Sequence, residues 1–255
     1  MVCSAAPGLL IEPFAGGGII SLTAVFEGMV ERALMVELDD EIAAVWKVVV
    51  NGESEWLAGK ILRFNMSKAN AAAALKRESA DYRDTAFKTI VKNRTFHGGI
   101  LAPGAGLVKN GESGKGVLSR WYPSTLAKRL RDIHRIHSKL EFRHADAFTV
   151  VDEYANDADA VFFIDPPYTA GGKNAGKRLY THYALDHDAL FGKCAALKGD
   201  FIMTYDNAPE VVDLAGKYRL QARPVAMRNT HHAEMTELVI SRNLDWMDET
   251  GRSAG

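Results

Sequence analysis

The stretch "GLLIEPFAGGGIISLTAVFEGMVERALMVELDDEIAAVWKVVVNG", residues 8–52, sets the expected fold. It begins with a short apolar run at 8–14 that meets a glycine cluster, and a second apolar run follows at 32–38. A helical segment lies between them and Gly28 is placed to end it, while Asp39 or Asp40 opens a second helix that closes near Gly52. Strand, helix, strand, helix in this order predicts the start of a parallel, doubly wound α/β sheet.

The same rhythm returns in the second half of the chain. Apolar runs at 140–148, 160–165 and 200–206 alternate with helical segments, and runs at 218–227 and 235–243 end the pattern. We therefore expect a mostly parallel sheet that finishes with a hairpin and a reversed C-terminal strand. Residues 53–139 interrupt this pattern, with helical character at 70–91 and from Ser124, and a glycine-rich stretch without periodicity at 92–116. The sequence predicts a catalytic domain of 1–52 and 140–246, an inserted helical subdomain of 53–139, and a tail of 247–255.

Composition narrows the class of protein. Hydrophobic residues make up 47% of the 255 residues, and no apolar run approaches the roughly 18 residues that a membrane span needs. Cys3 and Cys194 are the two cysteines and the eight histidines follow no ligand spacing, so we expect no disulfide framework, no metal and a cytoplasmic location. Residues 60–140 hold 17 Lys or Arg and 5 Asp or Glu, a balance of +12 in a chain of net charge −1. That asymmetry predicts a segment that faces a polyanion, with solvated helix faces as the alternative.

Acidic residues stand at the ends of four expected strands. Ligands of doubly wound sheets bind beyond the carboxyl ends of the strands, so Glu12, Glu37, Asp146 and Asp165 are candidate site residues. Glu37 is placed to accept hydrogen bonds from ribose hydroxyls, and Asp39 is better explained as a helix N-cap. Asp146 could bind the amino group of a cofactor's adenine or simply cap a helix or turn.

The motif "DPPY", 165–168, carries the strongest chemical signal. The exocyclic amine of a base is a poor nucleophile because its lone pair is delocalised into the ring. A carboxylate from Asp165 and the main-chain carbonyl of Pro166 could accept its two N–H bonds and localise that pair, on a turn that the prolines stiffen. Tyr168 could stack on a base rotated out of a duplex, and Phe14 could face a sulfonium cation. The structural alternative is a Pro-Pro turn that ends a strand, with Tyr168 in the core.

These motifs resemble the adenine-N6 DNA methyltransferases of the Dam type (D12 class), which use S-adenosylmethionine. "EPFAGGG" (12–18) is similar to their D-P-F-x-G-x-G loop with Glu12 in place of Asp, "VELDDEI" (36–42) to their second motif, and "DPPY" to their catalytic motif. "TELVISRN" (236–243) looks like their closing strand, and "KNRTFHGG" (92–99) resembles the N-R-x-x-F-N-G stretch of their recognition insertion. The resemblance implies a methyltransferase α/β sheet with an inserted DNA-recognition subdomain. It also implies base flipping, double-stranded DNA as partner, and a place in a restriction–modification system, a phage or a regulatory methylation system. The lack of an apolar span separately predicts no membrane association.

The resemblance and the charge pattern together assign site residues. The expected catalytic residues are Asp165, Pro166, Pro167 and Tyr168. The expected cofactor-binding residues are Glu12, Pro13, Phe14, Ala15, Gly16, Gly18, Glu37, Leu38, Asp146, Ala147 and Asp165. The expected DNA-binding residues are Lys92, Asn93, Arg94, Lys109, Lys115, Arg120, Tyr122, Lys128 and Arg131.

One family segment, W-x-G-G-K before the first strand, has no counterpart in residues 1–8. Three alternatives follow: weakened cofactor binding, a cofactor site completed by a second protein chain or a homodimer, or lost binding. Two further functions stay open, an RNA adenine methyltransferase and a DNA-binding subunit that is inactive without a partner chain. Asp165 and the large basic insertion favour DNA.

Overall fold

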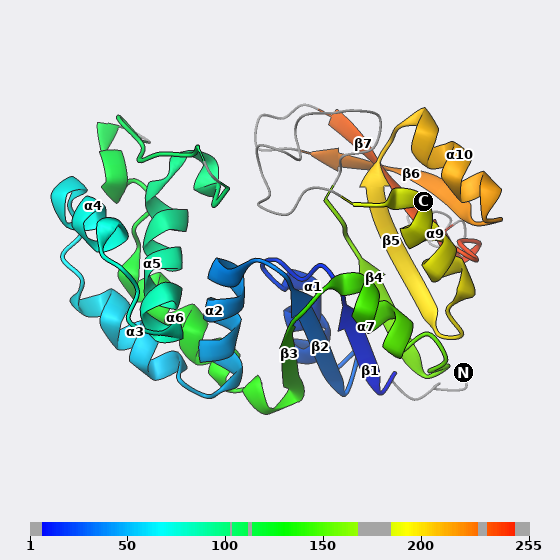
Figure 1. The fold of residues 1–255 in the computed structure, drawn as a ribbon, viewed down its shortest axis with the longest axis horizontal. Helices are drawn as coiled ribbons and strands as arrows, with labels where there is room; N and C mark the ends of the chain where they lie inside the picture. Colours follow the sequence, from blue (N-terminus) through cyan, green and yellow to red (C-terminus); the bar gives the residue numbers. More distant parts are fainter. Residues whose placement is uncertain (1–6, 103, 112–113, 168–184, 229–233, 248–255) are drawn as a thin grey trace, which may run out of the picture. The chain divides into compact units, whose positions relative to one another are not determined.

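The centre of the fold is a seven-stranded sheet with the order β3-β2-β1-β4-β5-β7-β6 (Figure 1). The computed structural model describes residues 7–102, 104–111, 114–167, 185–228 and 234–247. β1 pairs in parallel with β2 and β4, and β4 with β5, whereas β7 runs antiparallel to β5 and β6. The expected α/β class with a reversed C-terminal strand is therefore confirmed. The strands are β1 (Leu9–Glu12), β2 (Arg32–Glu37), β3 (Leu140–His144), β4 (Ala160–Ile164), β5 (Asp200–Asp206), β6 (Gln221–Arg228) and β7 (Glu234–Ser241).

The described residues divide into two compact units. Unit 1 holds 7–36, 145–167, 185–228 and 234–247, and unit 2 holds 37–102, 104–111 and 114–144. The helices of unit 1 are α1 (Ile19–Phe26), α7 (Ala147–Glu153), α9 (His187–Ala196) and α10 (Pro209–Lys217). The helices of unit 2 are α2 (Asp40–Val50), α3 (Ser54–Arg63), α4 (Lys68–Lys76), α5 (Tyr82–Thr95) and α6 (Pro123–His134), with short 3-10 turns η1 (His97–Gly99), η3 (Gly116–Leu118) and η4 (His137–Lys139). The predicted domain boundaries at 52/53 and 139/140 stay a prediction.

Unit 1 is built on a core of apolar strand residues. All four residues of β1 are buried, as expected for a strand covered on both faces of a mostly parallel sheet. β4 and β5 alternate buried and half-buried positions, and their buried side chains pack with residues of α9 and β7. Its largest fully buried side chains include Ile11, Phe162, Phe191, Met203 and Tyr205.

Gly199, between α9 and β5, lies very close to the main chain at and just before the start of β4. A Cβ added to Gly199 would lie 2.1 Å from the carbonyl oxygen of Ala160 and 2.8 Å from that of Asp157. Both neighbours are main-chain atoms, so Gly199→Ala should lower the free energy of unfolding by about 1–3 kcal/mol through overpacking. Chemical denaturation measures the loss. Gly216→Ala in α10 is the control, because its added Cβ meets nothing within 4 Å; equal stability of the two variants would contradict the expected clash.

Unit 2 is a helical assembly. α2 packs against α5, α3 packs against α6, and α4 packs against α5. Phe64 meets the rings of Phe87 and Trp121 edge to face, at centroid separations of 5.2 and 5.8 Å. In the part of the chain that the structure describes, no helix has the length and apolar character needed to cross a membrane.

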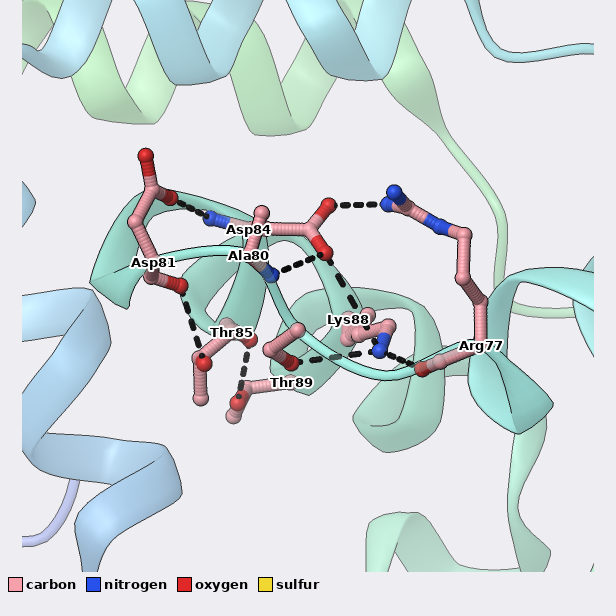
Figure 2. Close-up of polar contacts among 8 residues, drawn as sticks. Arg77, Ala80, Asp81, Asp84, Thr85, Lys88 and Thr89 are labelled. Carbon is pink, nitrogen blue, oxygen red and sulfur yellow. Dashed lines mark hydrogen bonds and ion pairs between the residues drawn. The ribbon is translucent and has the colours of Figure 1, made fainter.

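The helical character expected at 70–91 is divided between two helices, α4 and α5. The chain forms two helices there, because Asp81 accepts a hydrogen bond from the main-chain N–H of Asp84 and caps α5. A polar cluster fixes the connection (Figure 2). Arg77 forms an ion pair with Asp84, and the Lys88 ammonium donates to the carbonyl of Arg77 and lies 4.0 Å from Asp84. Lys88 is 9% exposed, so this cation of the basic segment serves the fold of unit 2.

The glycine-rich stretch at 92–116 also differs from its expectation. Its first four residues, 92–95, form the last turn of α5 rather than a loop. Thr95 donates a side-chain hydrogen bond to the carbonyl of Val91, and the helix ends before Gly98 and Gly99, whose φ angles are 66° and 74°. Three predicted DNA-binding residues, Lys92, Asn93 and Arg94, therefore lie in a helix and not in a loop.

Candidate functional site

The sheet places Glu12 and Asp165 on either side of its topological switch point. From β1 the chain continues to β2 and β3 on one side, while β4 and β5 lie on the other. β1 and β4 are parallel neighbours, with Ile11 opposite Phe162, so their carboxyl ends lie together. Open α/β sheets bind ligands outside the carboxyl ends of their strands at such a point. This region is the candidate functional site.

Glu12 is a buried acid at the end of β1. Its side chain is 3% exposed and accepts hydrogen bonds from the main-chain N–H of Ser21, at 3.0 Å, and from the Ser21 hydroxyl. Burial raises the pKa of Glu12 to about 7, the negative charge of Asp165 raises it further, and the two bonds from Ser21 oppose that rise. Near neutral pH this carboxyl group therefore exchanges readily between its charged and neutral forms.

The turn after β1 contains three glycines, so no side chain covers its main chain there. Gly16 and Gly18 have φ angles of 47° and 61°, and Gly18 is the N-cap of α1 without a side-chain hydrogen bond. The turn is fixed by a bond from the Ala15 N–H to the Val36 carbonyl, at 2.9 Å. A Cβ added at Gly16 or Gly17 would meet nothing within 4 Å. The turn therefore leaves room for a ligand to approach the backbone.

Asp165 follows β4 and is held by the neighbouring strand. Its Oδ1 accepts a 2.6 Å hydrogen bond from the Thr204 hydroxyl. The register that pairs Ile164 with Met203 places Thr204 beside the first residue after β4. Asp165 is exposed, whereas Pro166 and Pro167 are buried. The fourth predicted catalytic residue, Tyr168, lies outside the described residues.

Two further acids lie near this end of the sheet, and one of them, Glu237, interacts electrostatically with Asp165. Asp206 and Glu237 are register partners in the antiparallel β5–β7 pair. Burial raises the pKa of Glu237, and the charges of Asp165 and Asp206 raise it further. This end of the sheet thus carries four carboxyl groups, and their negative charge favours a positively charged or hydrogen-bond-donating ligand there. Sequence reasoning missed Glu237, Asp206 and Thr204; the place of Thr204 and Asp206 near the end of an apolar strand was the available signal.

Glu37 and Asp146 both contact the main chain locally. Glu37 accepts hydrogen bonds from the N–H groups of the next two residues, at 2.8 and 2.9 Å. Asp146 caps α7 through Phe148 and Thr149, at 2.9 and 3.3 Å, which is the alternative weighed for it. Their contacts with ribose and adenine stay predictions, whereas the N-cap role of Asp39 in α2 is confirmed. Of the remaining predicted cofactor residues, Pro13, Ala15 and Ala147 are buried, Phe14 is half-buried and Leu38 is exposed.

Three predicted DNA-binding cations are paired with carboxylates of unit 2. Lys92 lies 2.6 Å from Glu41, and Lys128 lies 2.6 Å from Asp132. Arg131 binds both carboxylate oxygens of Glu55, at 2.8 and 2.7 Å. The pairs with Glu41 and Glu55 reduce the basic surplus of residues 60–140, because these two acids lie outside that segment, whereas Asp132 is already counted in it.

The other predicted DNA-binding residues have different surroundings. The Asn93 amide donates to the carbonyl of Gly99 at 3.0 Å, and the Arg120 guanidinium donates to the carbonyl of Phe96 at 3.3 Å. Arg94 is half-buried in the last turn of α5. Lys109, Lys115 and Tyr122 are exposed.

The described residues offer neither a metal centre nor a reactive cysteine. Within the described ranges, no group of three or more His, Cys, Asp or Glu residues could hold a metal ion. Cys194 is buried, and its burial raises the pKa of the thiol to about 12. A thiol that stays protonated is a weak nucleophile, so Cys194 serves the core of unit 1.

Comparisons with known proteins give a distant likeness. No protein-family model matches the chain, and no curated protein matches it. Among solved structures, a proposed RNA methyltransferase from Pyrococcus horikoshii is similar over 94% of this chain and 77% of its own, at 10% identity and a TM-score of 0.39. The rRNA methyltransferase AviRa from Streptomyces viridochromogenes is similar over 94% and 78%, at 13% identity and a TM-score of 0.38. At TM-scores below 0.5, neither likeness carries an argument about this chain.

Proposed function

We propose that this chain transfers a methyl group from S-adenosylmethionine to the N6 amino group of an adenine in double-stranded DNA. The observation that carries the proposal is the placement of Asp165, bonded to Thr204 at the carboxyl end of β4 and followed by two buried prolines. An acid fixed beside the switch point of the sheet is placed to receive a bound base.

The glycine turn and the acids of unit 1 fit the methyl donor. S-adenosylmethionine, when bound, supplies a methyl group on a positively charged sulfur. The open space at Gly16 and Gly17 would admit it close to the main chain. Glu12, poised near pH 7, would ionise in response to a nearby cation, since an opposite charge favours the charged form.

Asp165 and the Pro166 carbonyl would prepare the accepting amine. Each accepts one N–H of the adenine amino group, which localises the nitrogen lone pair and aims it at the methyl carbon. The nitrogen would then form the new N–C bond as the S–C bond of the methyl donor breaks, with the S–C electron pair remaining on sulfur. One proton leaves the methylated nitrogen to water, because that proton becomes acidic once the methyl group arrives.

A paired adenine is inaccessible inside a duplex, so the target base would have to leave the helix. Rotation of a nucleotide out of the stack costs a few kcal/mol, and it is the usual solution for enzymes that act on bases. Tyr168 is proposed to stack on the extruded base, as the sequence motif suggests. The basic segment of unit 2 would hold the DNA backbone.

The proposal is tested by methyl incorporation from labelled S-adenosylmethionine into duplex DNA and into structured RNA. We expect label in DNA, recovered as N6-methyladenine after digestion to nucleosides. Label in RNA alone would replace the DNA assignment by an RNA one. Incorporation that needs a second added protein would instead favour a subunit role.

Thr204 is expected to position Asp165. Thr204→Val removes the hydroxyl that donates to the carboxylate at 2.6 Å. A hydrogen bond to a charged group contributes about 1.5–3 kcal/mol, so the methyl-transfer rate should fall about 10-fold to 100-fold. Thr204→Ser keeps the hydroxyl and should restore most of the rate. Equal rates for the valine and serine variants would show that this bond does not serve the reaction.

A further inference from the structure

Three arginines of unit 2 form a cluster that we call the arginine cluster: Arg94, Arg120 and Arg129. Arg94 lies in the last turn of α5, Arg120 follows η3, and Arg129 lies on α6. The positive charges of Arg120 and Arg129 both act on Arg94, and together with burial they lower its pKa, with burial as the larger cause. Three segments separated in sequence therefore bring like charges together.

The guanidinium of Arg120 is held at the C-terminal end of α5. It donates to the carbonyl of Phe96, the C-cap residue of that helix, at 3.3 Å. Gly99 makes room for it, because an added Cβ there would lie 2.7 Å from Arg120 Nη2 and 3.2 Å from the amide nitrogen of Asn93. Gly99 also has a φ angle of 74°, which favours glycine. The end of α5 is thus shaped around a cation.

Arg94 has a buried donor that its surroundings leave without a partner. Among the residues that the structure describes, the buried Nε–H of Arg94 donates a hydrogen bond to no acceptor. Buried polar groups of native proteins are nearly always hydrogen-bonded, so such a donor indicates a missing acceptor. The C-terminal end of a helix carries only about half a negative charge, which is too little to balance three guanidinium groups.

The arginine cluster differs from three other cations of this segment that the sequence also marks for DNA binding. Lys92, Lys128 and Arg131 each have a carboxylate within 2.8 Å. For Arg94, Arg120 and Arg129, no ion pair with a carboxylate is found within the described part of the chain. Internal acids therefore satisfy the first group of cations, and the second group is left for an external anion.

We propose that the arginine cluster binds a backbone phosphate of a nucleic acid. Guanidinium groups present a planar fork of donors that matches phosphate oxygens, and an exposed Arg129 beside a half-buried Arg94 gives the anion access from solvent. The inference rests on the proposed function for its class of ligand, since that function requires a nucleic acid to be held. It adds which cations hold the backbone and which do not.

The test measures binding without S-adenosylmethionine. Fluorescence anisotropy gives Kd for the full chain with duplex DNA, with structured RNA and with DNA in the presence of inorganic phosphate, over a range of salt concentrations. Arg94→Gln, Arg120→Gln and Arg129→Gln should each weaken binding several-fold and reduce the slope of log Kd against log salt by about one. Arg135→Gln is the matched control, because Arg135 is an exposed arginine just beyond α6 and lies 4.0 Å from Asp132.

Each outcome decides the inference. A reduced slope on DNA, RNA or both, with Arg135→Gln like the unaltered chain, supports a phosphodiester site and identifies its source. Unchanged slopes for all three variants overturn the inference. A cluster that binds inorganic phosphate but contributes nothing to the binding of DNA or RNA overturns it as well. Arg129 is exposed, so Arg129→Gln should fold normally. It therefore tests the inference even if Arg94→Gln fails to fold. If the slopes change but no adenine is methylated, the proposed function fails and this inference stands.

Discussion

Asp165→Ala is expected to abolish methyl transfer while the chain keeps its affinity for nucleic acid. The carboxylate is exposed, so its removal leaves no cavity in the core. The loss falls on the group that would polarise the adenine amine in the transition state. Removing one preorganised group of this kind costs about 10²–10³-fold in rate, and we expect at least that loss here. Single-turnover methylation of duplex DNA measures the change.

The control for this variant is Asp159→Ala. Asp159 is an exposed acid just before β4, at the opposite end of the strand from Asp165. Its loss should leave the methylation rate and the DNA affinity unchanged. Turnover of Asp165→Ala within 10-fold of the unaltered chain would remove Asp165 from the reaction and with it the proposed function.

Glu12→Gln is expected to stabilise the protein at alkaline pH. The folded state raises the pKa of Glu12 from 4.5 to about 7, mainly through burial. Between these values the folded chain binds a proton that the unfolded chain has released, so stability falls as pH rises from about 4.5 to about 7 and is level above. A pKa difference of that size corresponds to a loss of roughly 3 kcal/mol in the free energy of unfolding. Glutamine resembles the neutral acid and removes this loss.

The free energy of unfolding at pH 5 and pH 8 tests this expectation. Glu12→Gln should be more stable than the unaltered chain at pH 8, and the gap should narrow toward pH 5. Glu31→Gln changes an exposed glutamate of the same unit and should leave the pH dependence as it was. A gap that is the same at both pH values would show that the charge of Glu12 costs nothing in the fold. Binding of S-adenosylmethionine should, in contrast, weaken in Glu12→Gln.

The strands of the sheet could be predicted because their signal is local. The apolar run 200–206 matches the bounds of β5. Gly28 correctly predicted where α1 ends, and Asp39 correctly predicted where α2 begins. A residue type that caps or ends an element acts on its immediate neighbours, so its effect can be read along the chain. The reversed strand followed from the spacing of the last two apolar runs.

The helices of unit 2 could be predicted less well. The stretch at 70–91 contains helix-favouring residues, yet Asp81 caps a new helix and the Arg77–Asp84–Lys88 contacts fix the break. α5 also continues into a stretch that its glycines mark as a loop. Here propensity competes with side-chain contacts, and those contacts depend on partners that the helices bring together.

By itself, then, the sequence determined the fold class, the glycine turn and the acids at the strand ends, because each depends on a local pattern. Only the tertiary structure decided the partners of those residues. Thr204 joins Asp165 across 39 positions of sequence, and the charge of Asp165 acts on Glu237 of β7, the strand beyond β5. Likewise, the charges of Lys92 and Arg94 look alike in sequence, yet Glu41 neutralises one and two arginines face the other. Electrostatic interaction depends on distance in space, which residue spacing along the chain does not contain.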